Sequence, residues 1–120
     1  MRILITGSRD WSDRVAIARA IRQEWLDADR PYRVTVIHGG ARGADYLAGI
    51  YAKSMNFNVE EYKADWSLGK RAGYIRNQEM VDAGADVCLA FIRNKSKGAT
   101  MCAELAQQAG IPTKIWRQDD

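Results

Sequence analysis

The sequence predicts a single α/β domain built on a five-stranded parallel sheet of strand order 3-2-1-4-5, with helices on both faces. Three observations carry this prediction. Five short apolar runs alternate with four segments of helical periodicity, which is typical of right-handed βαβ units. The length of 120 residues suits one domain. No repeat, low-complexity tract or linker divides the chain.

The first βα unit occupies the N-terminal quarter of the chain. The apolar run Arg2–Thr6 predicts a buried strand, expected at the centre of the sheet. Apolar residues then recur at helical spacing over Asp13–Asp27, with Ser12 as the expected N-cap. The apolar run Arg33–Ile37 predicts the second strand.

The middle of the chain continues the alternation. Small and apolar residues fall on one face of a helix over Ala44–Ser54. The more polar run Asn58–Tyr62 predicts an edge strand, and Lys63–Gly69 is expected to be a loop. A third helix is expected over Lys70–Ala83.

The C-terminal part supplies one further βαβ unit. The apolar run Asp86–Ile92 predicts a fourth strand, and Thr100–Ala109 a fourth helix that Gly110 ends. Pro112–Trp116 is expected to form the last strand.

Composition narrows the functional classes. The net charge of +3 suits an anionic ligand but is too small to indicate nucleic acid as a partner. No apolar stretch approaches the ~20 residues that cross a bilayer, and the N-terminus lacks a signal-peptide pattern, so a cytoplasmic protein is expected. Cys88 and Cys102 have no metal-ligand spacing, so we expect two packing residues, no metal site and no cofactor.

Three glycine-bearing segments follow predicted strands and indicate a binding site. The most informative is His38–Asp45, because glycines between a strand and a helix let a ligand approach the backbone and the helix N-terminus. Such a turn either holds a phosphate or only packs helix against strand. Gly7–Arg9 and Lys97–Thr100 lie at two further strand ends. In open parallel sheets ligands bind at this edge, so the convergence favours a site.

Side chains in these turns suggest specific contacts. Ser8 and Arg9 can bind a phosphate, or form a solvated turn. His38, the only histidine, can touch a ribose or base, although a structural role is the better interpretation. Asp45 can accept from a ribose hydroxyl, or complement the helix dipole. Trp66 and Trp11 can stack on a base, or cover the core.

Arg76 is the strongest candidate outside the turns. It lies along the apolar face of the third predicted helix, where a buried guanidinium needs a partner. An anionic ligand or an internal carboxylate would supply it. Asn77 and Glu79 are lesser candidates on the same helix.

The motifs together resemble a known family. In chain order they are Gly7-Ser8-Arg9, His38-Gly-Gly-Ala-Arg-Gly-Ala-Asp45, Ala64-Asp-Trp66, Gly73-x-x-Arg76-Asn77-x-x-Met80, Ala90-Phe91, Lys97-Gly-Ala-Thr100 and Gly110-Ile-Pro112. The set resembles the YspA-like branch of the SLOG (SMF/DprA–LOG) superfamily. This resemblance implies a Rossmann-like three-layer sandwich that binds nucleotides or nucleotide-derived ligands. The superfamily also contains cytokinin-nucleotide phosphoribohydrolases, a DNA-processing branch that binds single strands, and sensors of ADP-ribose-type signals.

The sequence departs from the hydrolytic LOG motifs at two positions. Arg76 matches their catalytic arginine, but Asn77 replaces the following lysine. Ala103 stands where the resemblance would place the catalytic glutamate, and Glu104 comes one position later, about 100° further round a helix. Nucleotide binding is therefore expected more than hydrolysis, which would need Arg76 with Glu104 or Asp45.

The sequence as a whole predicts a protein that binds a phosphorylated ribonucleotide or ADP-ribose-like ligand, as a carrier, a sequestering protein or a sensor. An N-ribosidic hydrolase is the alternative, and single-stranded DNA binding ranks third. The partner is expected to be a nucleotide-derived small molecule, with a homo-oligomer possible and no membrane association. The expected site residues are Gly7, Ser8, Arg9, Gly39, Gly40, Gly43, Asp45, Arg76, Asn77, Gly98 and Thr100.

Overall fold

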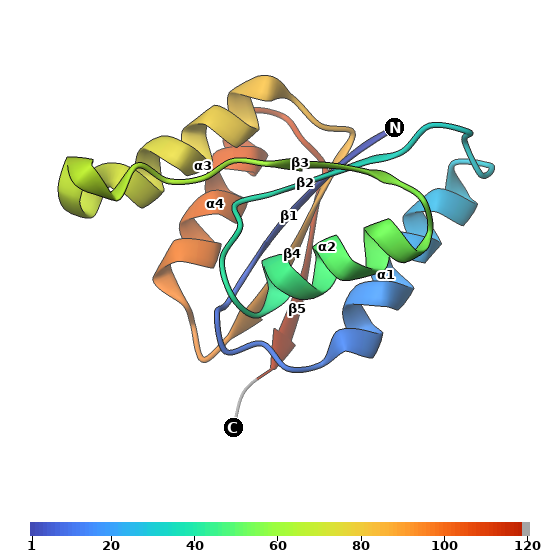
Figure 1. Cartoon of the computed structure of the whole chain (residues 1–120), viewed down its shortest axis with the longest axis horizontal. Coiled ribbons are helices and arrows are strands. Elements are labelled where there is room, and N and C mark those ends of the chain that lie inside the picture. Colours follow the sequence, from blue (N-terminus) through green and yellow to red (C-terminus); the bar gives the residue numbers. More distant parts are fainter. Residues whose placement is uncertain (119–120) are drawn as a thin grey trace.

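The computed structural model describes residues 1–118 and contains the predicted sheet. Its five strands are all parallel and lie in the order β3-β2-β1-β4-β5, which confirms the predicted fold class (Figure 1). The strands are β1 (Arg2–Gly7), β2 (Thr35–His38), β3 (Asn58–Glu61), β4 (Val87–Arg93) and β5 (Thr113–Gln118).

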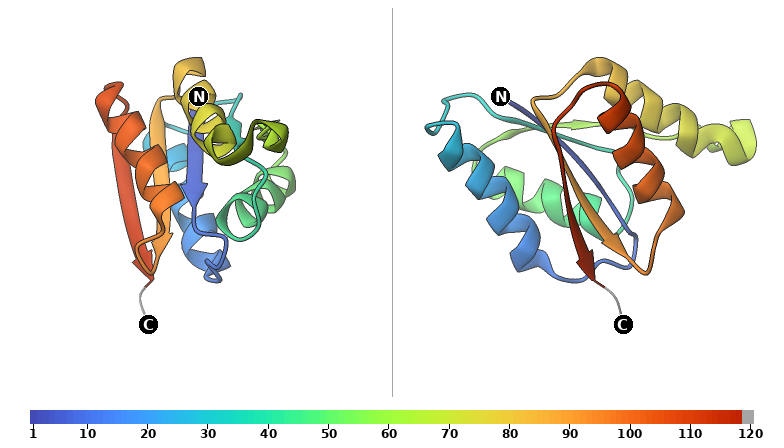
Figure 2. Two further views of the ribbon diagram at one scale, coloured as in Figure 1. Left: turned by 90° about the vertical axis from the view of Figure 1, so that its left-hand side faces the viewer. Right: turned by 180° about the vertical axis from the view of Figure 1, so that it is seen from behind.

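Two pairs of helices cover the two faces of the sheet. Figures 1 and 2 show α1 and α2 together on one face and α3 and α4 on the other. The helices are α1 (Arg14–Asp27), α2 (Ala44–Ser54), α3 (Ala72–Ala83) and α4 (Lys97–Gln108), and a short 3-10 helix, η1 (Trp66–Arg71), precedes α3. None of the helices within residues 1–118 is long and apolar enough to cross a membrane.

The central strand β1 owes its position to burial on both faces. Ile3, Leu4 and Ile5 are completely buried, and successive side chains of a strand point to opposite faces. Ile3 and Ile5 pack in the apolar cluster under α1 and α2, whereas Leu4 packs in the cluster under α3 and α4. A strand of this kind reads as a continuous apolar run, which is why the sequence indicated a central parallel strand.

The boundaries of several elements differ from the prediction. The N-cap of α1 is Asp13 and not Ser12, because the Asp13 side chain accepts a hydrogen bond from the Ala16 amide. The expected loop Lys63–Gly69 contains the start of η1, and α3 begins at Ala72.

The most consequential difference concerns α4, which begins at Lys97 and not at Thr100. The Thr100 amide donates to the carbonyl of Ser96 at 3.1 Å, so the helical ladder already includes Gly98. The glycine-bearing segment after β4 is therefore the first turn of a helix and not a loop before one. Its amides point from the helix N-terminus toward the carboxyl edge of the sheet.

Candidate functional site

A cleft of about 700 Å³ opens at the carboxyl edge of the sheet. It lies between the end of β1, the loop after β2, the first turns of α3 and the first turn of α4. We call it the main cleft. It is lined by Thr6, Gly7, Arg9, Asp10, Ala41, Arg42, Trp66, Lys70, Gly73, Tyr74, Arg76, Asn77, Ser96, Gly98, Ala99 and Met101.

A side lobe of about 420 Å³ adjoins the main cleft above the end of β2. The two hollows share Arg9, Ala41, Trp66 and Arg76, so these residues lie where the hollows meet. The side lobe is also lined by Gly39, Gly40, Glu61, Lys63 and Ala64. Together they form an elongated site with room for a ligand of more than one part.

Arg76 is held in position at this junction by two hydrogen bonds. Its Nε donates to Oδ1 of Asn77 at 2.9 Å, and its Nη1 donates to the carbonyl of Gly39 at 2.7 Å. The second bond joins α3 to the loop after β2. Because Asn77 is buried, its amide oxygen is a fixed acceptor that orients the guanidinium. Within residues 1–118, no carboxylate lies within salt-bridge distance of Arg76.

Close packing fixes the loop against this arginine. A Cβ atom on Gly39 would lie 2.5 Å from Nη1 of Arg76, so only glycine lets the guanidinium reach the backbone here. Gly43 has φ +72°, and a Cβ there would lie 2.4 Å from the carbonyl oxygen of Ser8. Glycine is therefore required at Gly43 by backbone conformation and packing, whereas at Gly39 it is required for the observed position of the Arg76 side chain.

Asp45 supports the loop from inside the protein. Its Oδ2 accepts hydrogen bonds from the amides of Gly39 at 3.1 Å and Ala41 at 3.2 Å. Its Oδ1 is buried and has no hydrogen-bond partner within the described residues. Burial raises the pKa of Asp45 to about 6, although the two amides and the nearby charge of Arg76 oppose the rise. Asp45 is thus a buried loop support at the start of α2.

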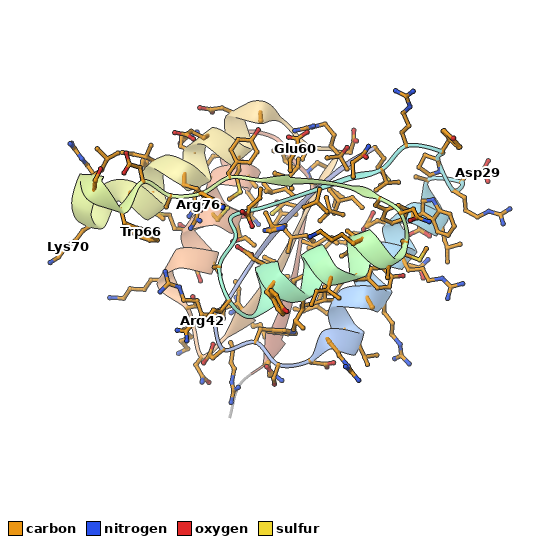
Figure 3. The ribbon with its side chains drawn as sticks, viewed as in Figure 1. Asp29, Arg42, Glu60, Trp66, Lys70 and Arg76 are labelled. Carbon is orange, nitrogen blue, oxygen red and sulfur yellow. The ribbon has the colours of Figure 1, made fainter. Side chains whose placement is uncertain are left out.

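The charge of the main cleft is predominantly positive. Four cationic side chains line it, those of Arg9, Arg42, Lys70 and Arg76, against the single carboxylate of Asp10. Figure 3 shows Arg42, Trp66, Lys70 and Arg76 gathered at one side of the molecule. A cleft with this balance attracts anions.

The structure brings together most of the residues predicted for the site. Arg76 and Gly40 lie on the same side of the sheet, as predicted. The predicted residues that line the main cleft or the side lobe are Gly7, Arg9, Gly39, Gly40, Arg76, Asn77 and Gly98.

Ser8 and Gly43 do not line either hollow. The hydroxyl of Ser8 is buried and accepts from the Arg93 amide at 2.7 Å while it donates to the Arg93 carbonyl at 3.3 Å. It therefore ties the ends of β1 and β4 together. Gly43 is the N-cap of α2 and packs against the backbone of Ser8.

Thr100 and Glu104 line a different hollow, which we call the outer hollow. Its other lining residues are Lys95, Lys97, Met101 and Arg117. The hydroxyl of Thr100 donates to the Ser96 carbonyl at 2.7 Å, which stabilises the first turn of α4. Met101 stands between the outer hollow and the main cleft, because it lines both. Glu104 is therefore separated from Arg76.

Of three residues with open interpretations, two have structural roles and one lines the site. His38 is buried, its Nδ1 accepts from the Gly40 amide at 2.9 Å, and burial lowers its pKa, which agrees with the structural interpretation. Trp11 is buried and packs edge-on against Phe91 in the core. Trp66, in contrast, is 58% exposed and lines both the main cleft and the side lobe.

Three cleft residues were not predicted individually. Arg42 lies within the predicted His38–Asp45 turn, whereas Glu61 and Tyr74 come from β3 and α3 and reach the site only through the fold. Helical spacing would have found Tyr74, because it lies three residues before Asn77 on α3. Among residues 1–118 no group of three or more His, Cys, Asp and Glu side chains is arranged to hold a metal ion.

Comparison with known proteins identifies the family. The family model YAcAr, described as the YspA, cpYpsA-related SLOG family, matches residues 1–69. The chain belongs to this SLOG family. It is also 51% identical over 117 residues to the Gene 61 protein of Mycobacterium phage D29, an alignment that covers 92% of each chain. No solved structure matches the chain. Membership of the SLOG family indicates a nucleotide-related role for this Rossmann-like fold.

Proposed function

We propose that this SLOG protein binds a phosphorylated ribonucleotide or an ADP-ribose-like derivative in the main cleft and side lobe. It would serve as a carrier, a sequestering protein or a sensor. One observation carries the proposal: Arg76 is positioned by two hydrogen bonds, yet no carboxylate within the described residues neutralises it. A half-buried guanidinium without an anionic partner is costly, and a phosphate would supply that partner.

The proposed phosphate position lies between Arg76 and the first turn of α4. The side chain of Ser96, the N-cap, makes no capping hydrogen bond, so the first amides of α4 are open to a ligand. A Cβ on Gly98 would meet no atom within 4 Å, which leaves room for an anion to approach the backbone. The surplus of cations in the main cleft supports the same ligand charge.

In the proposal the ribose lies between the phosphate and the rest of the ligand, with its hydroxyls directed into the side lobe. The lining of this lobe includes the exposed carboxylate of Glu61 and the backbone of Gly39 and Gly40, which suit the hydroxyls of a sugar. Asp45, which the sequence suggested for this contact, is occupied with the Gly39 and Ala41 amides. In the proposal it acts on the ligand only through the loop.

The placement of the acidic residues favours binding over hydrolysis. The alternative of an N-ribosidic hydrolase needs a general acid within hydrogen-bond reach of the reacting group. Glu104 lies in the outer hollow, and Asp45 is buried beneath the loop. Neither of these two acids joins Arg76 in lining the main cleft, and the carboxylates that do line the site, Asp10 in the main cleft and Glu61 in the side lobe, are not the catalytic acids that the resemblance implies. Single-stranded nucleic acid, a homo-oligomeric assembly and a cytoplasmic location remain predictions.

Calorimetric titration of the purified protein with AMP and with ADP-ribose tests the proposal. Arg76→Ala is expected to weaken binding about ten- to hundredfold, because a charge-assisted hydrogen bond in a partly desolvated site is worth roughly 1.5–3 kcal/mol. Arg22→Ala, which removes an exposed arginine on α1, is the matched control and should leave affinity unchanged.

Two outcomes would contradict the proposal. Unchanged affinity in a folded Arg76→Ala variant would show that Arg76 does not contact the ligand. Failure of both AMP and ADP-ribose to bind would exclude the proposed class of ligand. The same samples are analysed by chromatography after several hours. Release of free base or ribose phosphate that Arg76→Ala abolishes would favour the hydrolase instead.

A further inference from the structure

Trp66 is a large aromatic side chain exposed inside a cleft. It is 58% exposed and lines both the main cleft and the side lobe, whereas Trp11 is only 4% exposed and belongs to the core. Exposing an indole to water forgoes the free energy that its burial would contribute. The fold therefore leaves a flat apolar surface at the place where the two hollows meet.

The backbone beneath Trp66 is firmly anchored. Trp66 is the first residue of η1, and the side chain of Asp65 caps this helix by accepting from the Ser67 amide at 3.1 Å. A Cβ on Gly73 would lie 3.8 Å from Cη2 of the indole, so α3 presents bare backbone beside the ring. The ring is thus held at its edge while more than half of its surface stays open.

Arg9 faces this ring from the other side of the site. It comes from the loop after β1, and its guanidinium carbon lies over the indole, 5.9 Å from the ring centroid. Direct stacking over the ring centre would bring the two groups to about 3.5–4 Å, so the guanidinium does not stack directly on the centre of the indole. Within residues 1–118 the Arg9 guanidinium makes no hydrogen bond or ion pair that fixes it at this separation.

A small outward movement of Arg9 would make room for one flat ring between the two groups. An aromatic ring sandwiched between two planar groups needs about 7 Å between them, which is twice the contact distance. The present 5.9 Å would reach this value if the long, exposed Arg9 side chain moved outward by about 1 Å. A guanidinium and an indole both stack favourably on a nucleobase.

We propose that Trp66 and Arg9 form a base-recognition pair, with the nucleobase of the ligand inserted between them. This inference rests on the proposed nucleotide binding and adds to it a specificity-determining residue. It assigns the base to the junction of the two hollows, beside Arg76, which lines both. The protein then discriminates nucleotides from sugar phosphates that lack an aromatic base.

A comparison of AMP with ribose 5-phosphate tests the pair, because these ligands share ribose and phosphate but only AMP has a base. Wild-type protein is expected to bind AMP about ten- to hundredfold more tightly, the usual effect of one base stacked on an aromatic side chain. Trp66→Leu should remove most of this preference and leave ribose 5-phosphate affinity within about twofold. Trp66→Phe should retain most of the preference. Tyr32→Leu, at an exposed aromatic residue before β2, should change neither affinity.

Tryptophan fluorescence gives a second, independent measurement. AMP should quench the emission of wild-type protein, and Trp66→Phe should abolish the quenching while it still binds AMP. Equal affinity of the wild type for both ligands, or equal weakening of both by Trp66→Leu, would overturn the base-recognition pair and leave the nucleotide site intact. Failure of AMP, ADP-ribose and ribose 5-phosphate to bind would instead overturn the proposed function, and the pair with it.

Discussion

The Asp45→Asn variant is expected to gain stability relative to the wild type as the pH rises from acid to neutral. Oδ2 of Asp45 accepts from the amides of Gly39 and Ala41, and an asparagine carbonyl can accept the same two bonds. Oδ1 has no hydrogen-bond partner within the described residues. An amide group in that position is neutral, and burying it costs less than burying an ionised oxygen.

The magnitude follows from the pKa of the buried carboxyl. Burial raises the pKa of Asp45 from its usual 3.8 to about 6, which corresponds to about 3 kcal/mol. Below about pH 3 the carboxyl is mostly protonated in both the folded and the unfolded chain. Between about pH 4 and 6 the unfolded chain releases the proton while the folded chain keeps it. The contribution of Asp45 to the free energy of unfolding therefore falls as pH rises through this window, and is lowest above pH 6.

Urea denaturation of the wild type and Asp45→Asn between pH 4 and pH 7.5 measures the effect. The free energy of unfolding of the variant, relative to the wild type, should increase by about 2–3 kcal/mol across this range. Asp82→Asn, at an exposed position of α3, serves as the control and should follow the wild type. A constant difference between Asp45→Asn and the wild type at every pH would refute the desolvation argument.

Three further variants test the packing around the site. Gly43→Ala should destabilise the fold by roughly 2–5 kcal/mol, because the residue has φ +72° and its new Cβ would meet the backbone of Ser8. Gly98→Ala adds a Cβ that meets no atom, so its stability should be equal to that of the wild type or slightly higher. Equal denaturation midpoints for the two variants would contradict the packing argument. Ser8→Ala should cost about 1–3 kcal/mol of unfolding free energy through the lost bond to the Arg93 amide, whereas unchanged stability with weaker AMP binding would restore Ser8 as a ligand contact.

The sheet could be predicted because its determinants are local. Ile3, Leu4 and Ile5 are buried on both faces, so the sequence shows a continuous apolar run where the central strand lies. Alternation of such runs with helical periodicity then limits the topology to a few choices. The order of strands and the edge at which Arg76 meets Gly39 follow from these rules without knowledge of side-chain contacts.

The individual site residues were less predictable, because a polar side chain at a strand end has several possible partners. Ser8 and Asp45 were expected to meet a ligand, yet each satisfies buried backbone groups next to the cleft. Thr100 and Glu104 line the outer hollow and not the main cleft, and α4 begins three residues earlier than predicted. Arg42 belongs to the predicted turn after β2, but which hollow its side chain lines depends on packing that the sequence pattern does not describe.

The two departures from the LOG hydrolase motifs acquire a physical explanation in the structure. Asn77 is buried and accepts from Nε of Arg76, a bond that lysine, which has no acceptor, could not make. Ala103 is 2% exposed and packs in an apolar cluster with Ala90, Ile92 and Ala99, where a glutamate would bury an unpaired charge. Both replacements therefore suit a site in which Asn77 holds Arg76 in place and position 103 carries no acid. These two positions support the proposal of ligand binding without turnover.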